Sequence, residues 1–334
     1  MFGIDKIKLI ETPSPMERLD NLSEVLGINL YIKRDDMLST IGMGGNKLRK
    51  LEYLVCEAEK QGATMLLTYG GAQTNHGRLT AAAAAKRGLK CAIIAVDDHP
   101  ENMNANLLLD RLMGCDVYII DKAHDAEKIK AEIFEKYKNE KIYEIPVGGS
   151  NELGAIGYMD CAAEMNGQLE KMGIREGKVI CAAGSLGTYL GLWTGFRMMN
   201  APYECIGIAI SPFDDKKEKR ITEYFQQIKS AYNLPFDAVR GDFHIEKDYV
   251  RGGYNLPDET VRKAIYLMAS KEAVILDPCY TGKAFAGILQ MIEEGKIKKG
   301  ENVIFVHTGG SPAVYTPFHR CEMEKELGDG YFLL

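Results

Sequence analysis

The sequence has little that would place it in a membrane or outside the cell. No apolar run is long enough to cross a bilayer, and residues 1–6 lack the apolar core of a secretory signal peptide. We therefore expect no membrane segment and no membrane partner.

Paired cysteines are also absent. The 8 cysteines are scattered without C-x-x-C spacing, and no histidine cluster has the spacing of metal ligands. These features predict a cytoplasmic protein with reduced cysteines and no metal. Six cysteines lie in or beside apolar segments and are expected to be small buried hydrophobes: Cys56, Cys91, Cys115, Cys161, Cys181 and Cys205.

An excess of basic residues is missing as well. The net charge is -6 and no basic stripe stands out, which argues against a nucleic-acid partner. The chain is instead rich in apolar residues, which make up 46% of its 334 positions. That content is enough for a large core, in two domains or one large one.

Short apolar segments alternate with helical ones along most of the chain, which predicts an α/β fold with largely parallel sheets flanked by helices. The predicted strands are 29–34, 65–69, 91–96, 117–120, 142–147, 178–182, 204–210, 273–276 and 302–306. Helices are predicted over about 47–62, 102–113, 123–137 and 152–172 and after His76 and Thr188, and residues 213–270 are expected to be mostly helical.

Four polar, glycine-bearing loops follow predicted strands. Ligands of open parallel sheets bind at the carboxyl ends of the strands, so these loops could converge on one site. They are residues 68–71, 182–185, 277–280 and 307–310.

Lys47 follows a predicted turn at residues 44–46 and opens a helix whose apolar residues recur from Leu48 to Val55. The macrodipole disfavours an exposed cation at this end of a helix by roughly 0.3–1 kcal/mol. Lys47 is therefore either an ordinary surface lysine or a lysine that meets an anion or an aldehyde.

The segment Gly184-Ser185-Leu186-Gly187-Thr188 lies between an apolar strand and a helix. Such a loop can turn several N–H groups toward a phosphate, or it can be an ordinary glycine-rich turn. It matches neither the Rossmann nor the Walker A pattern. The strand 204–210 ends in Ser211-Pro212 without the acidic residue that would hold a ribose, which argues against a nicotinamide enzyme.

Three further positions are open to two interpretations. The helix start Thr74-Asn75-His76 suits a carboxylate, although it could be a simple capping segment. Tyr280, after a proline turn, and Tyr254, among glycines, could line a site or serve only in packing.

Six segments, in order, resemble the pyridoxal-phosphate (PLP) enzymes related to D-cysteine desulfhydrase and 1-aminocyclopropane-1-carboxylate (ACC) deaminase. The resemblance runs from about residue 8 to residue 316. The segments are Gly44-Gly45-Asn46-Lys47-x-Arg49-Lys50-Leu51-Glu52, Gly70-Gly71-Ala72-Gln73-Thr74-Asn75-His76, Ile145-Pro146-Val147-Gly148-Gly149-Ser150-Asn151, Gly184-Ser185-Leu186-Gly187-Thr188, Asp277-Pro278-Cys279-Tyr280-Thr281-Gly282-Lys283 and His307-Thr308-Gly309-Gly310.

This resemblance implies fold type II of the PLP enzymes, similar to the tryptophan synthase β chain, and a homodimer. A large PLP-binding domain would consist of residues 1–48 and 161–334. A small domain, residues 49–160, would be inserted between them.

The resemblance also implies the site residues. Lys47 would hold PLP as a Schiff base, Asn75 would contact the ring hydroxyl, and Thr308 the pyridine nitrogen. The carboxylate of a small amino-acid substrate would meet Thr74, Asn75 and His76, and Tyr280 and Tyr254 would line the reacting face. The catalytic candidates are therefore Lys47, Tyr280, Thr74 and Tyr254, and the phosphate would be held by Gly184, Ser185, Leu186, Gly187 and Thr188.

Two positions favour the desulfhydrase branch of the family: His76 stands where the deaminases resemble one another in having Gln, and Thr281 where they carry Glu. We therefore expect a lyase that converts D-cysteine to pyruvate, sulfide and ammonia. Thr74 replaces the usual Ser and narrows the pocket, so elimination from another β-substituted amino acid such as cysteate stays open. ACC deamination is an alternative, and a nicotinamide-dependent oxidoreductase or a non-catalytic amino-acid-binding protein are alternatives of other classes.

Overall fold

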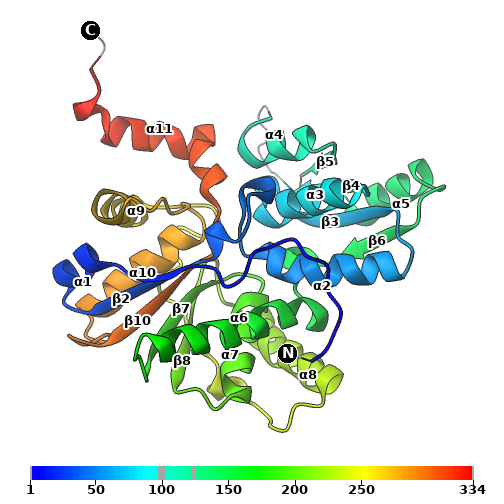
Figure 1. Ribbon diagram of the computed structural model, residues 1–334. Helices are drawn as coiled ribbons and strands as arrows, with labels where there is room; N and C mark the ends of the chain where they lie inside the picture. Colours follow the sequence, from blue (N-terminus) through cyan, green and yellow to red (C-terminus); the bar gives the residue numbers. More distant parts are fainter. Residues whose placement is uncertain (1, 97–102, 122–124, 333–334) are drawn as a thin grey trace.

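The apolar segments pair into two sheets in the computed structural model, which describes residues 2–96, 103–121 and 125–332 (Figure 1). Within these residues one sheet has six strands in the order β1-β2-β10-β7-β8-β9, and the other has four in the order β5-β4-β3-β6. The paired strands run parallel, apart from β1 with β2, which confirms the predicted fold class. The strands are β1 Met16–Arg18, β2 Asn29–Arg34, β3 Met65–Gly71, β4 Lys90–Val96, β5 Asp116–Ile120, β6 Ile142–Ile145, β7 Gly177–Ala183, β8 Tyr203–Ala209, β9 His244–Glu246 and β10 Asn302–His307.

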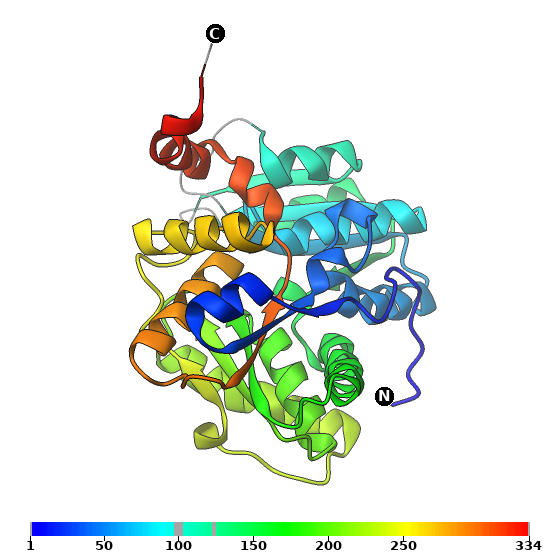
Figure 2. The ribbon, with the colours of Figure 1, turned by 60° about the vertical axis from the view of Figure 1, so that its left-hand side comes forward.

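Helices cover the sheets, as the turn of the view between Figures 1 and 2 shows. Helices α2–α5 lie beside the four-stranded sheet, and α1 and α6–α10 lie beside the six-stranded sheet. The helices are α1 Asp20–Leu26, α2 Lys47–Lys60, α3 Asn75–Arg87, α4 Ala105–Leu112, α5 Ala126–Lys136, α6 Glu152–Lys171, α7 Gly187–Met198, α8 Asp215–Tyr232, α9 Glu259–Glu272, α10 Thr281–Glu293 and α11 Pro317–Glu326.

Strands that are covered on both faces explain the continuous apolar runs of the sequence. Residues 65–68 of β3 and 91–95 of β4 are buried, and α3, whose small residues 81–84 are buried too, contacts both strands. All six cysteines that were predicted to be buried are buried. Every strand of the four-stranded sheet lies between residues 65 and 145, inside the predicted small domain, while the domain boundaries themselves stay a prediction.

One prediction is wrong. Residues 273–276 form no strand: they connect α9 to α10, and buried Val274 and Leu276 flank exposed Ile275, an alternation that mimics a strand. Residues 213–270 are helical over slightly more than half of their length, in α8 and the first part of α9, and prolines and glycines between 235 and 257 separate the two helices. The strands β1 and β9 and the helices α1, α10 and α11 were not predicted, and the helix starts predicted at 102 and 123 lie outside the described residues.

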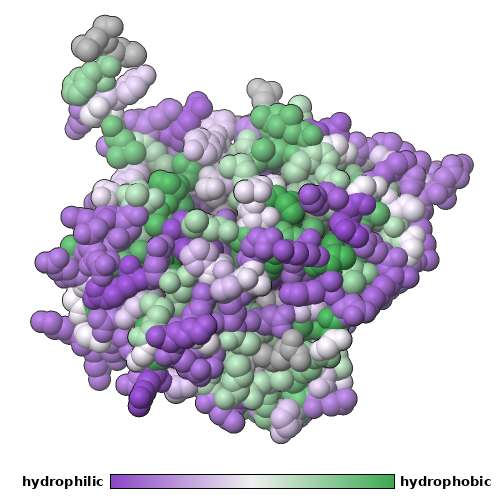
Figure 3. All heavy atoms as spheres, in the orientation of Figure 1, coloured by the Kyte–Doolittle hydropathy of each residue, from purple (hydrophilic) through white to green (hydrophobic). Residues whose placement is uncertain are grey.

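The face in Figure 3 is largely hydrophilic, and apolar side chains gather on it over α4. Leu108 and Leu112 of α4 are 44% and 73% exposed. Among the described residues, none of the helices combines the length and apolarity of a bilayer span.

Candidate active site

A cavity of about 620 Å³ lies at the carboxyl ends of β3, β7 and β10. Each of the four loops that were predicted to converge contributes to its wall: Gly70 and Gly71, Gly184 and Ser185, Tyr280, and Thr308. The two sheets therefore present their loops to one shared space.

Lys47 enters this cavity from the first residue of α2. The turn before it needs glycine, because Gly44 has φ 65° and a Cβ there would lie 2.4 Å from the carbonyl oxygen of Asp36. Lys47 Nζ donates to Asn46 Oδ1 at 3.1 Å. Burial lowers the pKa of Lys47 to about 8, and the negative charge of Asp277 opposes this shift. An amine with this pKa is more often neutral than an ordinary lysine, and it can act as a nucleophile or base.

Across the cavity, the loop before α7 forms a polar cradle. A Cβ on Gly187 would lie 2.6 Å from both Lys50 Nζ and Ser150 Oγ, so an amine and a hydroxyl lie tightly against this loop. Ser150 Oγ and Ser185 Oγ share a hydrogen bond of 2.7 Å, and Asn46 Nδ2 donates to Thr188 Oγ1 at 3.0 Å. Together with the N-terminus of α7, these groups suit a phosphate.

Leu186 lies in this loop with φ 68°, in the left-handed region that favours glycine. Its side chain is buried in the core of the six-stranded sheet. The burial of this side chain holds the loop in a conformation that a leucine rarely adopts.

The segment Thr74-Asn75-His76 forms another part of the cavity wall. Thr74 caps α3 and accepts from the backbone N–H of Gly77 at 3.3 Å. The His76 Nε2 atom lies 2.9 Å from Thr68 Oγ1. Burial, and then the charges of Lys47 and Lys50, lower the pKa of His76 well below its ordinary value, so the imidazole is neutral.

Two tyrosines close the remaining side. The hydroxyl groups of Tyr254 and Tyr280 lie 2.8 Å apart, and their rings meet edge to face. Burial raises the pKa of Tyr280 well above its ordinary value, so its phenol keeps a proton that it can donate. Tyr254 is 42% exposed and lies nearer the mouth of the cavity.

The structure thus brings all but one of the sequence-predicted site residues to this cavity; Gly187 lies just behind the wall. Sequence reasoning missed Asn46, Lys50 and Ser150. The three-residue spacing of Lys47 and Lys50 places both on one side of a helix and could have indicated Lys50.

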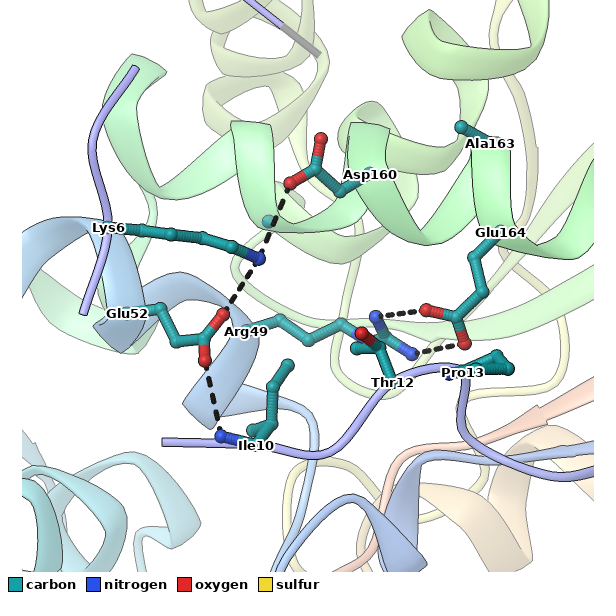
Figure 4. Close-up of a pocket in the computed structure, with 10 residues that line it drawn as sticks. Lys6, Ile10, Thr12, Pro13, Arg49, Glu52, Asp160, Ala163 and Glu164 are labelled. Atoms are coloured by element: carbon teal, nitrogen blue, oxygen red, sulfur yellow. Dashed lines mark hydrogen bonds and ion pairs between the residues drawn. The ribbon is translucent and has the colours of Figure 1, made fainter. Parts of the chain in front are cut away.

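A second cavity, of about 360 Å³, lies on the other side of α2 between α2, α6 and the N-terminal segment (Figure 4). Its charged side chains are paired with one another: Lys6 with Glu52 at 2.9 Å, and Arg49 with Glu164 at 3.0 Å. The first pair ties the N-terminal segment to α2 and the second ties α2 to α6, and we assign this cavity a structural role.

A family model described as pyridoxal-phosphate dependent enzyme matches residues 7–309. The chain belongs to this family. A D-cysteine desulfhydrase of Yersinia enterocolitica is 38% identical over 319 residues, 93% of this chain and 95% of that protein. A protein of Pyrococcus abyssi with the provisional name 1-aminocyclopropane-1-carboxylate deaminase is 36% identical, with 96% of each chain covered. The crystal structure of an ACC deaminase homologue superposes with a TM-score of 0.85, at 31% identity and 97% coverage of both chains.

PLP is therefore the cofactor, and the chain has the type II fold of PLP enzymes. The residues of the cavity fit this cofactor. Lys47 supplies the amine that an aldehyde requires, and the loop at Gly187, with Lys50 and Ser150 against it, suits the phosphate.

Proposed function

We propose that the protein is a PLP-dependent lyase that acts on D-cysteine, with water, to give pyruvate, sulfide and ammonia. The observation that carries this proposal is the Lys47 amine of lowered pKa, which shares one cavity with the polar loop before α7. The name of the Yersinia enterocolitica relative supports the substrate.

The proposed cofactor contacts follow from the cavity wall. Ser185, Thr188, Lys50 and the N-terminus of α7 would hold the phosphate, and Asn75 and Thr308 would hold the ring. When bound, PLP supplies the electron sink for bonds that break at the substrate α-carbon.

The proposed proton transfers use Lys47 and Tyr280. The Lys47 amine takes the α-proton, because its lowered pKa leaves part of it unprotonated near neutral pH. Tyr280 donates its phenolic proton to the departing sulfur, and Tyr254 restrains that hydroxyl through their shared hydrogen bond. The substrate carboxylate lies at the N-terminus of α3, against Thr74 and the N–H groups of Asn75 and His76.

The surroundings of Thr281 support the desulfhydrase branch over ring-opening of ACC. The Thr281 side chain is fully buried and donates to Asp277 Oδ1 at 2.7 Å. A carboxylic acid at this position, such as the Glu that the resemblance gives for the deaminases, could protonate the ring nitrogen of PLP. A threonine hydroxyl cannot, and the hydroxyl of Thr281 already donates to Asp277.

The direct test is a panel of D-cysteine, L-cysteine, cysteate and ACC, assayed for pyruvate, 2-oxobutanoate, sulfide and sulfite. We expect pyruvate and sulfide in equal amounts from D-cysteine. Borohydride reduction and peptide mass analysis should place the cofactor on Lys47, and Lys47→Ala should reduce turnover by about 10³-fold or more. 2-Oxobutanoate and ammonia from ACC, without turnover of D-cysteine, would assign the protein to the deaminases. Wild-type protein without a label on Lys47, together with a fully active Lys47→Ala variant, would favour a nicotinamide enzyme. Wild-type protein without turnover of any substrate would favour an amino-acid-binding protein.

Thr74 tests the choice of substrate. Thr74→Ser keeps the capping hydroxyl and removes one methyl group from the cavity wall. We expect unchanged PLP binding and a shift of about 10-fold in the ratio of kcat/KM values for D-cysteine, cysteate and ACC, as for other pocket methylenes. An unchanged ratio would mean that Thr74 only caps α3.

We further propose a cytoplasmic homodimer. The described cysteines are all free, which suits a reducing compartment, and the exposed Leu112 of α4 offers apolar contact surface. Sedimentation equilibrium should give twice the chain mass, and Leu112→Glu should shift it toward the monomer.

A further inference from the structure

Asn75 lies at the cavity, yet its carboxamide is held from behind by a residue of another helix. Asn106 of α4 is fully buried, and its Nδ2 donates to the backbone carbonyl of Gln73 at 2.8 Å and to Asn75 Oδ1 at 3.1 Å. The Asn106 backbone N–H donates to Gln73 Oε1 at 3.0 Å. Asn106 therefore binds the whole turn that leads into α3.

These contacts determine which way each amide points. The carbonyl of Gln73 can only accept, so the Asn106 atom against it must be the NH₂ group. That same nitrogen meets Asn75, so the Asn75 atom at the contact must be its oxygen.

Arg78 gives independent evidence for this orientation. Its guanidinium, which can only donate, places Nη2 3.4 Å from the same Asn75 oxygen. Arg78 also donates to the carbonyl groups of Gly42 and Gly44, in the turn before Lys47. It thus joins the Asn75 carboxamide to the turn that positions the lysine.

The Asn75 NH₂ group points away from these partners. It lies beside Gly310, where an added Cβ would be 2.9 Å from Nδ2. Within the described residues it has no acceptor in the protein, and Asn75 lines the cavity. The amide is therefore presented to a ligand as a hydrogen-bond donor.

We propose that Asn106, together with Arg78, is a positioning residue that fixes the Asn75 carboxamide with its N–H donors toward the cavity. Asn75 then donates to the ring oxygen of bound PLP and favours its deprotonated form. This inference rests on the proposed contact between Asn75 and the cofactor ring.

The test is Asn106→Asp in the full-length protein. Aspartate has the same shape but cannot donate, and its carboxylate would draw the Asn75 NH₂ group away from the cavity. We expect the dissociation constant of PLP to rise about 10-fold to 100-fold, the range for one hydrogen bond to a charged group. We also expect the pH midpoint of the visible absorption of bound PLP to rise by about one unit.

A double-mutant cycle separates positioning from a general effect on the fold. In an Asn75→Ala background, Asn106→Asp should change the dissociation constant of PLP by less than about twofold and the pH midpoint by less than about 0.3 unit. The matched control is Asn104→Asp, which adds the same charge at the start of α4 but keeps the acceptor that Asn104 Oδ1 offers to Gln73. It should leave PLP binding within about twofold of the wild type.

Equal effects of Asn106→Asp in both backgrounds, or an unmoved pH midpoint, would overturn the inference. If this variant does not fold, Asn106→Ala carries the same cycle, with an expected loss of PLP affinity of about 3-fold or more. Wild-type protein that carries no PLP on Lys47 would instead overturn the proposed function. The two failures are thus distinct.

Discussion

Two buried arginines, each in a helix that begins at the cavity, have opposite electrostatic surroundings. Arg49 of α2 donates to Asp35 at 2.8 and 2.9 Å and to Glu164 at 3.0 and 3.1 Å. Burial acts to lower the pKa of Arg49, but the charge of Asp35 and further hydrogen bonds outweigh it and raise the pKa well above its ordinary value.

Arg78 of α3 has neutral partners instead, the carbonyl groups of Gly42 and Gly44 and the oxygen of Asn75. Burial lowers the pKa of Arg78 to about 10, although the charge of Asp110 opposes it. No carboxylate within the described residues is paired with Arg78, and both carboxylate oxygens of Asp110 lack a hydrogen-bond partner there.

This difference distinguishes an arginine that anchors a helix in the fold from an arginine that positions residues of the site. The carboxylates around Arg49 come from β2's end and from α6, so they hold α2 in the fold. Arg78 instead connects two parts of the cavity wall. We therefore expect loss of Arg49 to act mainly on stability, and loss of Arg78 to act mainly on the site.

Replacing Arg49 is the strongest test of this difference. Arg49→Met should lower the free energy of unfolding by about 3–5 kcal/mol, because Asp35 is left as a buried charge without its partner. Urea denaturation measures this. Lys60→Gln, on the same helix, removes the cation of an exposed pair with Asp5; it is the control and should leave the free energy of unfolding close to that of the wild type. A loss of about 1 kcal/mol or less for Arg49→Met would contradict an anchoring role.

Replacing Arg78 should destabilise the protein less and disturb the cofactor more. Arg78→Met removes charged donors from neutral carbonyl groups, and we expect a loss of about 2 kcal/mol in stability. PLP affinity should fall by about 10-fold, measured by equilibrium dialysis, since one hydrogen bond to Asn75 is lost. Equal losses of unfolding free energy for Arg49→Met and Arg78→Met would contradict the distinction between an anchoring and a positioning arginine.

The buried carboxyl group of Asp110, whose charge acts on Arg78, adds a pH dependence of stability to this comparison. Burial raises the pKa of Asp110 to about 7, although the charge of Arg78 opposes this shift. The folded state therefore holds a proton that the unfolded state releases near pH 4, and stability falls as pH rises between these values. We expect a decrease of about 1 kcal/mol per pH unit between pH 5 and 6.5, from urea midpoints. Asp110→Asn should abolish this slope, and a wild-type slope of zero would mean that Asp110 is charged and well paired.

His244 is a solvent-exposed titratable residue for comparison with buried Asp110, and we expect it to have the smallest pH-dependent effect on stability. Its hydrogen bond to Glu204, at 2.7 Å, raises the pKa of the imidazole against the opposing effect of burial. The resulting stability is present below about pH 6.5 and is lost as pH rises through the folded pKa. The side chain is 41% exposed, so we expect less than about 0.5 kcal/mol, measured as the difference from His244→Gln. A larger change would mean that solvent does not screen this cluster.

Much of the site could be predicted from local sequence. The glycine turn before Lys47, the loop 184–188 and the helix start at Thr74 each depend on neighbours in the chain, and the structure brings all three to one cavity. The strand predicted at 273–276 failed because alternating apolar residues do not show whether a neighbouring strand is present to pair with them.

The sequence by itself determined the parallel α/β architecture, the buried cysteines and the lysine at a helix start, because these follow from composition and spacing. Only the tertiary structure decided that Arg49 meets Glu164, 115 residues away, and that Asn106 meets Asn75, 31 residues away. Such contacts depend on which helices pack together and on which atoms then lie within hydrogen-bond distance. The same reason applies to Lys50, one helical turn beyond Lys47, because only the tertiary structure shows that the loop at Gly187 packs against it.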